Sequence, residues 1–333
     1  MSVGFLNLLE VIVNGLMVGM LYSLVALGFV LIFKASGIFN YAQGVMALFA
    51  ALTLVGLQTG QVPFSHLINA VFGTAVHDFG WTLTPVVAVA LTVVAMVALA
   101  FLVERLLLRH LVNQEPIILF MATIGLAYFL EGLGDLMWGA DVKMVDIGLP
   151  SGGSLWIEEL TAGWAAEGER YFGMYIDRLD IAAMVVAGEL VVTLTLFSQY
   201  TRTGRALRAV ADDHQAALSV GISLRAIWVI VWSIAGIVAL VAGVMWGAKS
   251  GVQFSLSLIA LKALPVLILG GFTSIPGAIV GGLIIGVGEK LFEFTIGPMI
   301  GGATENWFAY VLALVFLMFR PQGLFGERLI ERV

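Results

Sequence analysis

The stretch "LEVIVNGLMVGMLYSLVALGFVLIF", residues 9–33, decides the fold class of this chain. Glu10 is its one charged residue, and the other positions are apolar, small or uncharged. A helix needs about 20 predominantly apolar residues to cross the hydrocarbon core of a bilayer. The stretch is therefore predicted to be a membrane-spanning helix.

The composition of the whole chain supports this interpretation. Hydrophobic residues make up 60% and charged residues 11%, and the mean hydropathy is +1.03. Soluble domains are about half apolar and about a quarter charged, so a polytopic membrane protein is predicted. The chain contains no cysteine, which excludes disulfides and cysteine-ligated metals. Its histidines are scattered, and no cofactor or metal site is predicted.

Apolar runs of similar length recur along the chain. They lie near residues 9–33, 83–104, 116–138, 179–198, 225–247, 276–296 and 305–319. The runs near 40–58 and 257–272 are shorter or interrupted. No segments alternate as the strands of a lipid-facing barrel do, and helices are then the way for backbone to cross lipid. We predict an all-α fold with about nine transmembrane helices, and residues 1–333 are predicted to form a single transmembrane domain.

Lysine and arginine gather in alternate loops, which predicts the orientation of the chain. The cations that set it are Lys34, Arg105, Arg109, Arg202, Arg205, Arg208, Arg225, Arg320, Arg328 and Arg332. They all fall on the cytoplasmic side if the N-terminus is outside and the C-terminus is cytoplasmic. Residues 199–224 then form a cytoplasmic loop, and the acidic, aromatic segment 139–178 is extracytoplasmic.

The charged stretch 201–223, "TRTGRALRAVADDHQAALSVGIS", is unusual in so apolar a chain. Its spacing predicts a short amphipathic helix that Gly221 ends. One face carries Leu207, Val210, His214 and Leu218, and the other sides carry Arg205, Arg208, Asp212 and Gln215. The stretch is either a solvated connector that follows the positive-inside rule or a helix that docks on a soluble partner.

The chain has no GxxxxGK[ST] motif, and so no phosphate-cradling loop of its own. It is therefore predicted not to be an enzyme. If transport is driven by ATP, a separate chain supplies the ATPase, and the stretch 201–223 is the segment of useful length for that partner to hold.

Polar residues interrupt two of the apolar runs. Asn40, Tyr41 and Gln43 stand at the beginning of one run, and Lys262 and Pro265 lie inside another. Ionisable residues within a membrane segment by default face a cavity or a partner, so these five residues are the predicted substrate pathway. The alternatives are a helix cap for Asn40 and Gln43 and snorkelling to the membrane surface for Lys262.

Carboxylates and glycines predict further contacts between helices. Glu131, Asp135 and Glu189 lie in apolar runs, and they either pair with Lys262 or Lys290 or line a path. Glycines four residues apart let helices touch closely. They are Gly277, Gly281, Gly282 and Gly286. Packing within the chain is favoured for them over a subunit interface.

Four motifs in this order carry a resemblance to a known family. They are "FNYAQG" (39–44), "TGRALRAVADD" (203–213), "LGGFTSIPGAIVGGLIIGVGE" (269–289) and "FRPQGLFG" (319–326). Together they resemble the permease subunits of the branched-chain amino acid ABC importers over nearly the whole chain. The resemblance implies a multi-pass inner-membrane subunit with a small-molecule substrate and no nucleic acid partner.

The same resemblance implies the other components of the machine. They are a second, usually non-identical permease subunit, two cytoplasmic ATPase subunits that bind ATP, and an extracytoplasmic substrate-binding protein. Residues 199–224 match the family's ATPase-coupling loop. The residues expected at or near the ATPase are Gly204, Arg205, Arg208, Ala211 and Asp212, together with Leu207 from the apolar face.

Two alternatives to a branched-chain amino acid importer stay open. The same machine could import urea, short amides or aromatic acids, and segment 139–178 is longer and more acidic than in the simplest family members. An ion-driven secondary transporter is the other alternative. It would not need a docking helix, and it would more often carry paired carboxylates at the bilayer centre.

Overall fold

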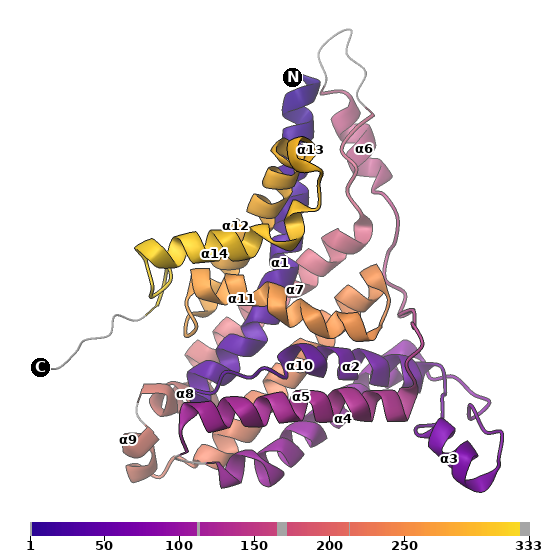
Figure 1. Ribbon diagram of the computed structural model, residues 1–333, viewed down its shortest axis with the longest axis vertical. Coiled ribbons are helices and arrows are strands. Elements are labelled where there is room, and N and C mark those ends of the chain that lie inside the picture. Colours follow the sequence, from indigo (N-terminus) through magenta and orange to yellow (C-terminus); the bar gives the residue numbers. More distant parts are fainter. Residues whose placement is uncertain (1, 112–113, 165–171, 213, 327–333) are drawn as a thin grey trace, which may run out of the picture. The chain divides into compact units, whose positions relative to one another are not determined.

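The computed structural model describes residues 2–111, 114–164, 172–212 and 214–326. Within these ranges helices dominate, and β pairing is limited to isolated bridges. The predicted all-α class is therefore confirmed (Figure 1). Residues 165–171 of the predicted outer segment, and Arg328 and Arg332 of the predicted cytoplasmic end, lie outside the described residues.

Within the described ranges, 6 helices are long and apolar enough to cross a membrane. They are α1 (Val3–Ser36), α4 (Pro85–Leu106), α5 (Pro116–Trp138), α7 (Arg178–Tyr200), α10 (Leu224–Ser250) and α12 (Ile275–Thr295). The shorter apolar helices are α2 (Gln43–Gln58), α11 (Ile259–Gly270) with the preceding turn η2 (Phe254–Leu258), and α14 (Phe308–Phe319). The two runs predicted to be short are thus short. The run 305–319 was predicted to be long and yields only α14, so the count of nine spans stays a prediction.

The helices pack as two compact units. Unit 1 comprises residues 1–26, 149–191 and 262–333, and unit 2 comprises residues 27–148 and 192–261. Helices α1, α7 and α11 each continue from one unit into the other. Each unit is therefore assembled from segments that lie far apart in the sequence.

Helix α2 forms the core of unit 2. Every residue of α2 from Gln43 to Gly56 is buried, because α4, α5, α10 and η2 pack around it. Gly243 of α10 allows a close approach, since a side chain there would overlap the carbonyl oxygen of Ala47 on α2. A helix that is apolar all round and buried on all sides fits the lack of a polar face in its sequence.

Three loops of unit 2, which carry Gln61, Lys143 and Val252, are joined by hydrogen bonds. The amide of Gln61 donates to the Trp138 carbonyl at 2.9 Å, and the Lys143 ammonium donates to Gln61 Oε1 at 2.7 Å. Lys143 and Val252 exchange backbone hydrogen bonds at 3.0 and 2.7 Å. These loops therefore meet at one end of the unit, and which side of the membrane that end faces stays a prediction.

Unit 1 is built on close contact between α1 and α12. A Cβ on Gly19 would lie 2.6 Å from the Gly282 carbonyl oxygen, and one on Gly15 would lie 2.7 Å from the Cα of Val287. The hydroxyl of Ser23 on α1 also donates to the Ile279 carbonyl at 3.3 Å. Such close approach is the packing that small residues at four-residue spacing allow. The prediction that these glycines pack within the chain is confirmed.

The remaining short helices are α3 (Ser65–Phe72) and η1 (Leu108–His110) in unit 2, and α6 (Leu155–Ala162), α13 (Gly297–Ile300) and η3 (Thr304–Asn306) in unit 1. Unit 1 also holds the end of the described chain. The Leu324 amide donates to the Leu269 carbonyl at 2.8 Å, and the Phe325 amide donates to the Gly270 carbonyl at 3.2 Å. The motif 319–326 is thereby fixed to the end of α11.

Candidate translocation and coupling sites

The first polar cluster lies at the beginning of α2 in unit 2. Asn40 and Gln43 are 0% and 1% exposed. The Asn40 side chain accepts from the Ala42 amide at 3.2 Å and donates to Gln43 Oε1 at 3.3 Å. Gln43 in turn donates to the Ala235 carbonyl of α10 at 3.2 Å. Asn40 therefore supports the turn before α2, whose N-cap residue is Ala42 without a side-chain cap, while Gln43 ties α2 to α10.

Tyr41 of the same motif faces a small cavity inside unit 2. Its backbone amide donates to Thr123 Oγ1 at 3.1 Å, which fixes the chain against α5. The cavity has a volume of about 140 Å³. It is lined by Tyr41, Val45, Ala127, Tyr128, Glu131, Ser257, Leu258, Ala260 and Leu261. Of the three predicted pathway residues in unit 2, Tyr41 alone is among these lining residues.

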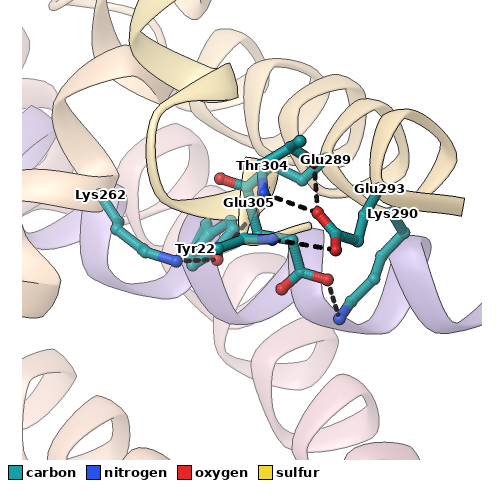
Figure 2. A network of polar contacts seen from close by, with 8 residues as sticks. Tyr22, Lys262, Glu289, Lys290, Glu293, Thr304 and Glu305 are labelled. Carbon is teal, nitrogen blue, oxygen red and sulfur yellow. Dashed lines mark hydrogen bonds and ion pairs between the residues drawn. The ribbon is translucent and has the colours of Figure 1, made fainter. Parts of the chain in front are cut away.

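The second polar cluster lies in unit 1, where side chains of α1, α11 and α12 meet (Figure 2). The Tyr22 hydroxyl donates to Glu289 Oε2 at 2.9 Å. The Lys262 ammonium donates to the Tyr22 hydroxyl at 3.4 Å and lies 5.8 Å from the centroid of the Tyr22 ring. Tyr22 and Glu289 are 2% and 1% exposed. The Lys262 side chain therefore points to the buried Tyr22 of its own unit. A lysine that snorkels to the membrane surface would not need such a partner.

Pro265 lies inside α11, three residues after Lys262 and on the buried part of the helix. Proline removes a helical N–H and obstructs the preceding turn. It therefore weakens the helical hydrogen bonding next to Lys262, and this places an irregular position of α11 beside the charged cluster.

A second charge pair stands beside this cluster in unit 1. Lys290 Nζ lies 2.7 Å from Glu305 Oε1, and the Glu293 carboxylate accepts from the Thr304 amide at 2.7 Å and from the Thr304 hydroxyl. These bonds hold the turn η3 against α12. Glu131, Asp135 and Glu189 were predicted to pair with Lys262 or Lys290 or to line a path. The pairing with Lys290 is wrong, because Glu305 is its partner, whereas Glu131 lines the cavity of unit 2.

Sequence reasoning missed Tyr22 and Glu289. Tyr22 lies in the apolar run 9–33, where an aromatic residue is interpreted as part of the packed core. Glu289 lies next to Lys290 near the end of an apolar run, where charged residues are common. The available signal was the rule that an intramembrane cation implies an anionic partner. That rule names a type of partner and leaves its position open.

The predicted coupling loop forms two helices in unit 2, α8 (Arg202–Asp212) and α9 (His214–Ser219). Thr201 Oγ1 accepts from the Gly204 amide at 2.9 Å and caps α8. A side chain on Gly204 would overlap carbonyl oxygens at the end of α7. Gly221 has a φ of 83°, so the predicted stop is confirmed.

The apolar face of α8 is turned inward. Leu207 and Val210 are 4% and 0% exposed, and α8 packs against α10. Arg208 donates to the Ser198 carbonyl at 2.9 Å, which satisfies a free carbonyl near the end of α7. Ala211 is half-buried near the end of α8. Asp212 is the last residue of α8.

Other side chains of the segment are exposed. Arg205 is exposed and makes one long bond, 3.4 Å, to the Tyr200 carbonyl. Leu218 and Val220 are 48% and 74% exposed. The prediction that Leu218 shares the buried face of Leu207 is wrong, because Leu218 is on the surface and the neighbouring Ala217, at 2% exposed, takes the buried position. The accessible surface of the segment therefore combines Arg205 with Leu218 and Val220.

These features define a helical protein of the membrane type with two buried polar clusters and a charged helix pair outside its candidate spans. The chain belongs to the family described as branched-chain amino acid transport system / permease component, whose model matches residues 11–320. The predicted family resemblance is confirmed.

Relatives match over nearly the whole length. The high-affinity branched-chain amino acid transport system permease protein LivH of Escherichia coli (strain K12) is 28% identical over 335 residues, which is 100% of both chains. BraD of Pseudomonas aeruginosa, which bears the same description, is 29% identical over 334 residues and 98% of both chains. Among solved structures, PsaBC from Streptococcus pneumoniae in complex with Fab covers 93% of this chain and 91% of that chain, with a TM-score of 0.45 and 12% identity. That likeness is too weak to carry an argument.

Proposed function

We propose that this chain is a permease subunit of an ATP-driven importer in the inner membrane, and that it carries branched-chain or related amino acids. It works with a second permease subunit, two cytoplasmic ATPases that bind the ATP, and an extracytoplasmic binding protein. The family match over residues 11–320 supports the amino acid substrate. The observation that carries the coupling role is the helix pair α8–α9, which is anchored on one side and exposed on the other.

The anchoring explains how this loop can transmit force. Leu207, Val210 and the Arg208 bond to the end of α7 fasten α8 to unit 2. Motion of an ATPase bound to the exposed side would then pass into α7 and α10 and would not be lost in a flexible loop. The coupling residues accordingly divide into two roles. Gly204, Leu207 and Arg208 hold or shape α8, and Arg205 faces the partner.

The predicted pathway residues enter the proposal in the same way. Tyr41 lines the cavity of unit 2, Asn40 and Gln43 shape the polar beginning of α2, and Lys262 and Pro265 belong to the part of α11 beside the Tyr22–Glu289 bond. Polar groups this deep in an apolar chain are the features expected along a transport path.

The alternatives gain no support from the comparisons. The relatives LivH and BraD are both named as branched-chain amino acid permeases. The urea and amide importers and the ion-driven transporter therefore serve as outcomes of the experiment.

The experiment compares charge reversal and apolar loss on the exposed side of α8–α9 with a distant control. Arg205→Glu and Leu218→Asp are expected to reduce co-purification of the ATPases. The effect of Arg205→Glu should depend on the salt concentration, because like charges that meet at an interface cost several kcal/mol and rim charges steer association. The matched control is Arg178→Glu, an exposed arginine at the start of α7.

Uptake completes the test. Proteoliposomes with all subunits should import L-leucine only with ATP inside and should not import urea. Uptake driven by an ion gradient without the ATPases would overturn the proposal, as would full ATPase retention by both α8–α9 variants.

A further inference from the structure

Among the described residues, one oxygen of the Glu289 carboxylate has no hydrogen-bond partner. Glu289 is 1% exposed and its Oε2 accepts from Tyr22. Its Oε1 is buried, and within the part of the chain that the structure describes it has no hydrogen-bond partner. Leaving a buried acceptor unsatisfied is unfavourable, and more so for a charged group. The site therefore calls for a donor from outside the described chain.

The Lys262 ammonium has the opposite deficit. An ammonium carries three donors, and among the described residues Lys262 makes one hydrogen bond, the 3.4 Å bond to the Tyr22 hydroxyl. The Tyr22 hydroxyl stands between the two charges, since it donates to Glu289 and accepts from Lys262 (Figure 2). The cluster thus presents a free acceptor and free donors on either side of one phenol.

The neighbouring pair Lys290–Glu305 shows what a purely structural ion pair looks like in this unit. Its charged atoms are in direct contact at 2.7 Å, and its side chains are 31% and 33% exposed. In the Lys262–Tyr22–Glu289 cluster the carboxylate is more buried than that of Glu305. The Tyr22 hydroxyl nevertheless separates the two charges, so that Glu289 Oε1 and N–H groups of Lys262 make no hydrogen bond among the described residues. A pair that served packing alone would gain by closing directly.

We propose that Glu289, Tyr22 and Lys262 form a subsite for the charged ends of a free α-amino acid. The substrate ammonium donates to Glu289 Oε1, and the substrate carboxylate accepts from Lys262 Nζ. The site charges cancel and the zwitterion is neutral, so binding adds no net charge to an apolar surrounding. Urea and short amides have neither charge and would leave both ends unmatched. This proposal rests on the proposed function and specifies the groups of the substrate that this chain binds, namely its ammonium and its carboxylate.

The test measures binding of tritiated L-leucine to the assembled transporter in nanodiscs, without the binding protein. The competitors are isoamylamine, which keeps the ammonium and lacks the carboxylate, and isocaproate, which keeps the carboxylate and lacks the ammonium. A charge-assisted hydrogen bond that is lost weakens binding by about tenfold or more. Wild type is therefore expected to prefer leucine over each analogue by at least about tenfold.

The two single variants should change selectivity in opposite directions. Glu289→Gln removes the anionic acceptor, so the preference for leucine over isocaproate should collapse while the preference over isoamylamine remains. Lys262→Met removes the cation that binds the carboxylate, so the preference for leucine over isoamylamine should be lost and the preference for leucine over isocaproate should remain. A residue that matters only for folding would lower all binding together and would not reverse the ranking between the two variants.

Two double variants control for folding and charge. Lys262→Met/Glu289→Gln removes both charges, leaves no uncompensated ion, and should assemble with its partners but lose leucine binding. Lys290→Met/Glu305→Gln removes the neighbouring pair and should bind like wild type. An unchanged competition profile in Glu289→Gln would mean that Oε1 meets only water and would overturn the subsite, as would the absence of leucine binding by wild type. Failure of the proposed function is separate, since it appears as a lack of ATP-driven uptake.

Discussion

Replacing Leu207 by alanine should loosen α8 before it affects any partner. The Leu207 side chain is 4% exposed and lies on the face of α8 that packs in unit 2. Truncating a buried leucine to alanine costs about 2–5 kcal/mol. Helix α8 is not among the candidate membrane spans, so values from water-soluble proteins apply. Since each 1.4 kcal/mol is about a factor of ten, local opening should become at least about 30-fold more frequent.

Hydrogen–deuterium exchange of the α8 amides measures this opening directly. The matched variant is Leu218→Ala, because Leu218 is 48% exposed and surface substitutions usually stay within about 0.5 kcal/mol. Exchange in α8 should accelerate by about 30-fold or more in Leu207→Ala and stay at the wild-type rate in Leu218→Ala. Equal rates in Leu207→Ala and wild type, or equal acceleration in both variants, would refute the inward orientation of α8.

Three further predictions follow from single contacts. Gly19→Ala should destabilise the purified permease by about 1–3 kcal/mol, because the added methyl group overpacks against Gly282. The control Gly125→Ala should leave the stability unchanged, since nothing lies within 4 Å of its added Cβ. Equal thermal stabilities of the two variants would contradict the α1–α12 contact. Burial lowers the pKa of Lys143 below its usual 10.5, because desolvation disfavours the charged amine. The neutral amine is therefore present at lower pH, and acylation of Lys143 should reach its midpoint below that of a lysine in a peptide; a midpoint at or above 10.5 would be the contrary result. An impermeant thiol reagent on intact spheroplasts should label Ser151→Cys and spare Ser219→Cys, both exposed positions in a chain without cysteine, and the reverse pattern would invert the predicted orientation.

Hydropathy was sufficient where a helix depends on its own residues. The run 9–33 became α1, since an apolar segment of that length is helical wherever lipid surrounds it. At 305–319 it located a helix but not where the helix begins, because Glu293 binds the Thr304 amide and the turn η3 precedes α14. That partner lies on another helix, and a sliding window of hydropathy does not contain it.

Periodicity was sufficient for α8 and failed at Leu218 in α9. The spacing of Leu207 and Val210 correctly gave the apolar side of α8. The same period, extended to Leu218, predicted a further buried side chain at that position. At 3.6 residues per turn, a shift of one position rotates a side chain by about 100°. In α9 the buried position is therefore taken by Ala217, at 2% exposed, and Leu218 is left on the surface.

The polar clusters show why a sequence can locate half of a buried site. Lys262 and Gln43 stand out because each interrupts an apolar run, and the unfavourable transfer of polar groups into such surroundings implies a compensating partner. For Gln43 the partner is the backbone of Ala235, which has no signature in the sequence. For Lys262 it is Tyr22, 240 positions away, and through its hydroxyl the carboxylate of Glu289. Local sequence therefore identifies the group that needs compensation, and the fold supplies the groups that provide it. In the Lys262 cluster that compensation is incomplete among the described residues, since Glu289 Oε1 is left without a donor. This distinguishes it from the closed Lys290–Glu305 pair and leaves hydrogen-bonding capacity that a charged ligand can use.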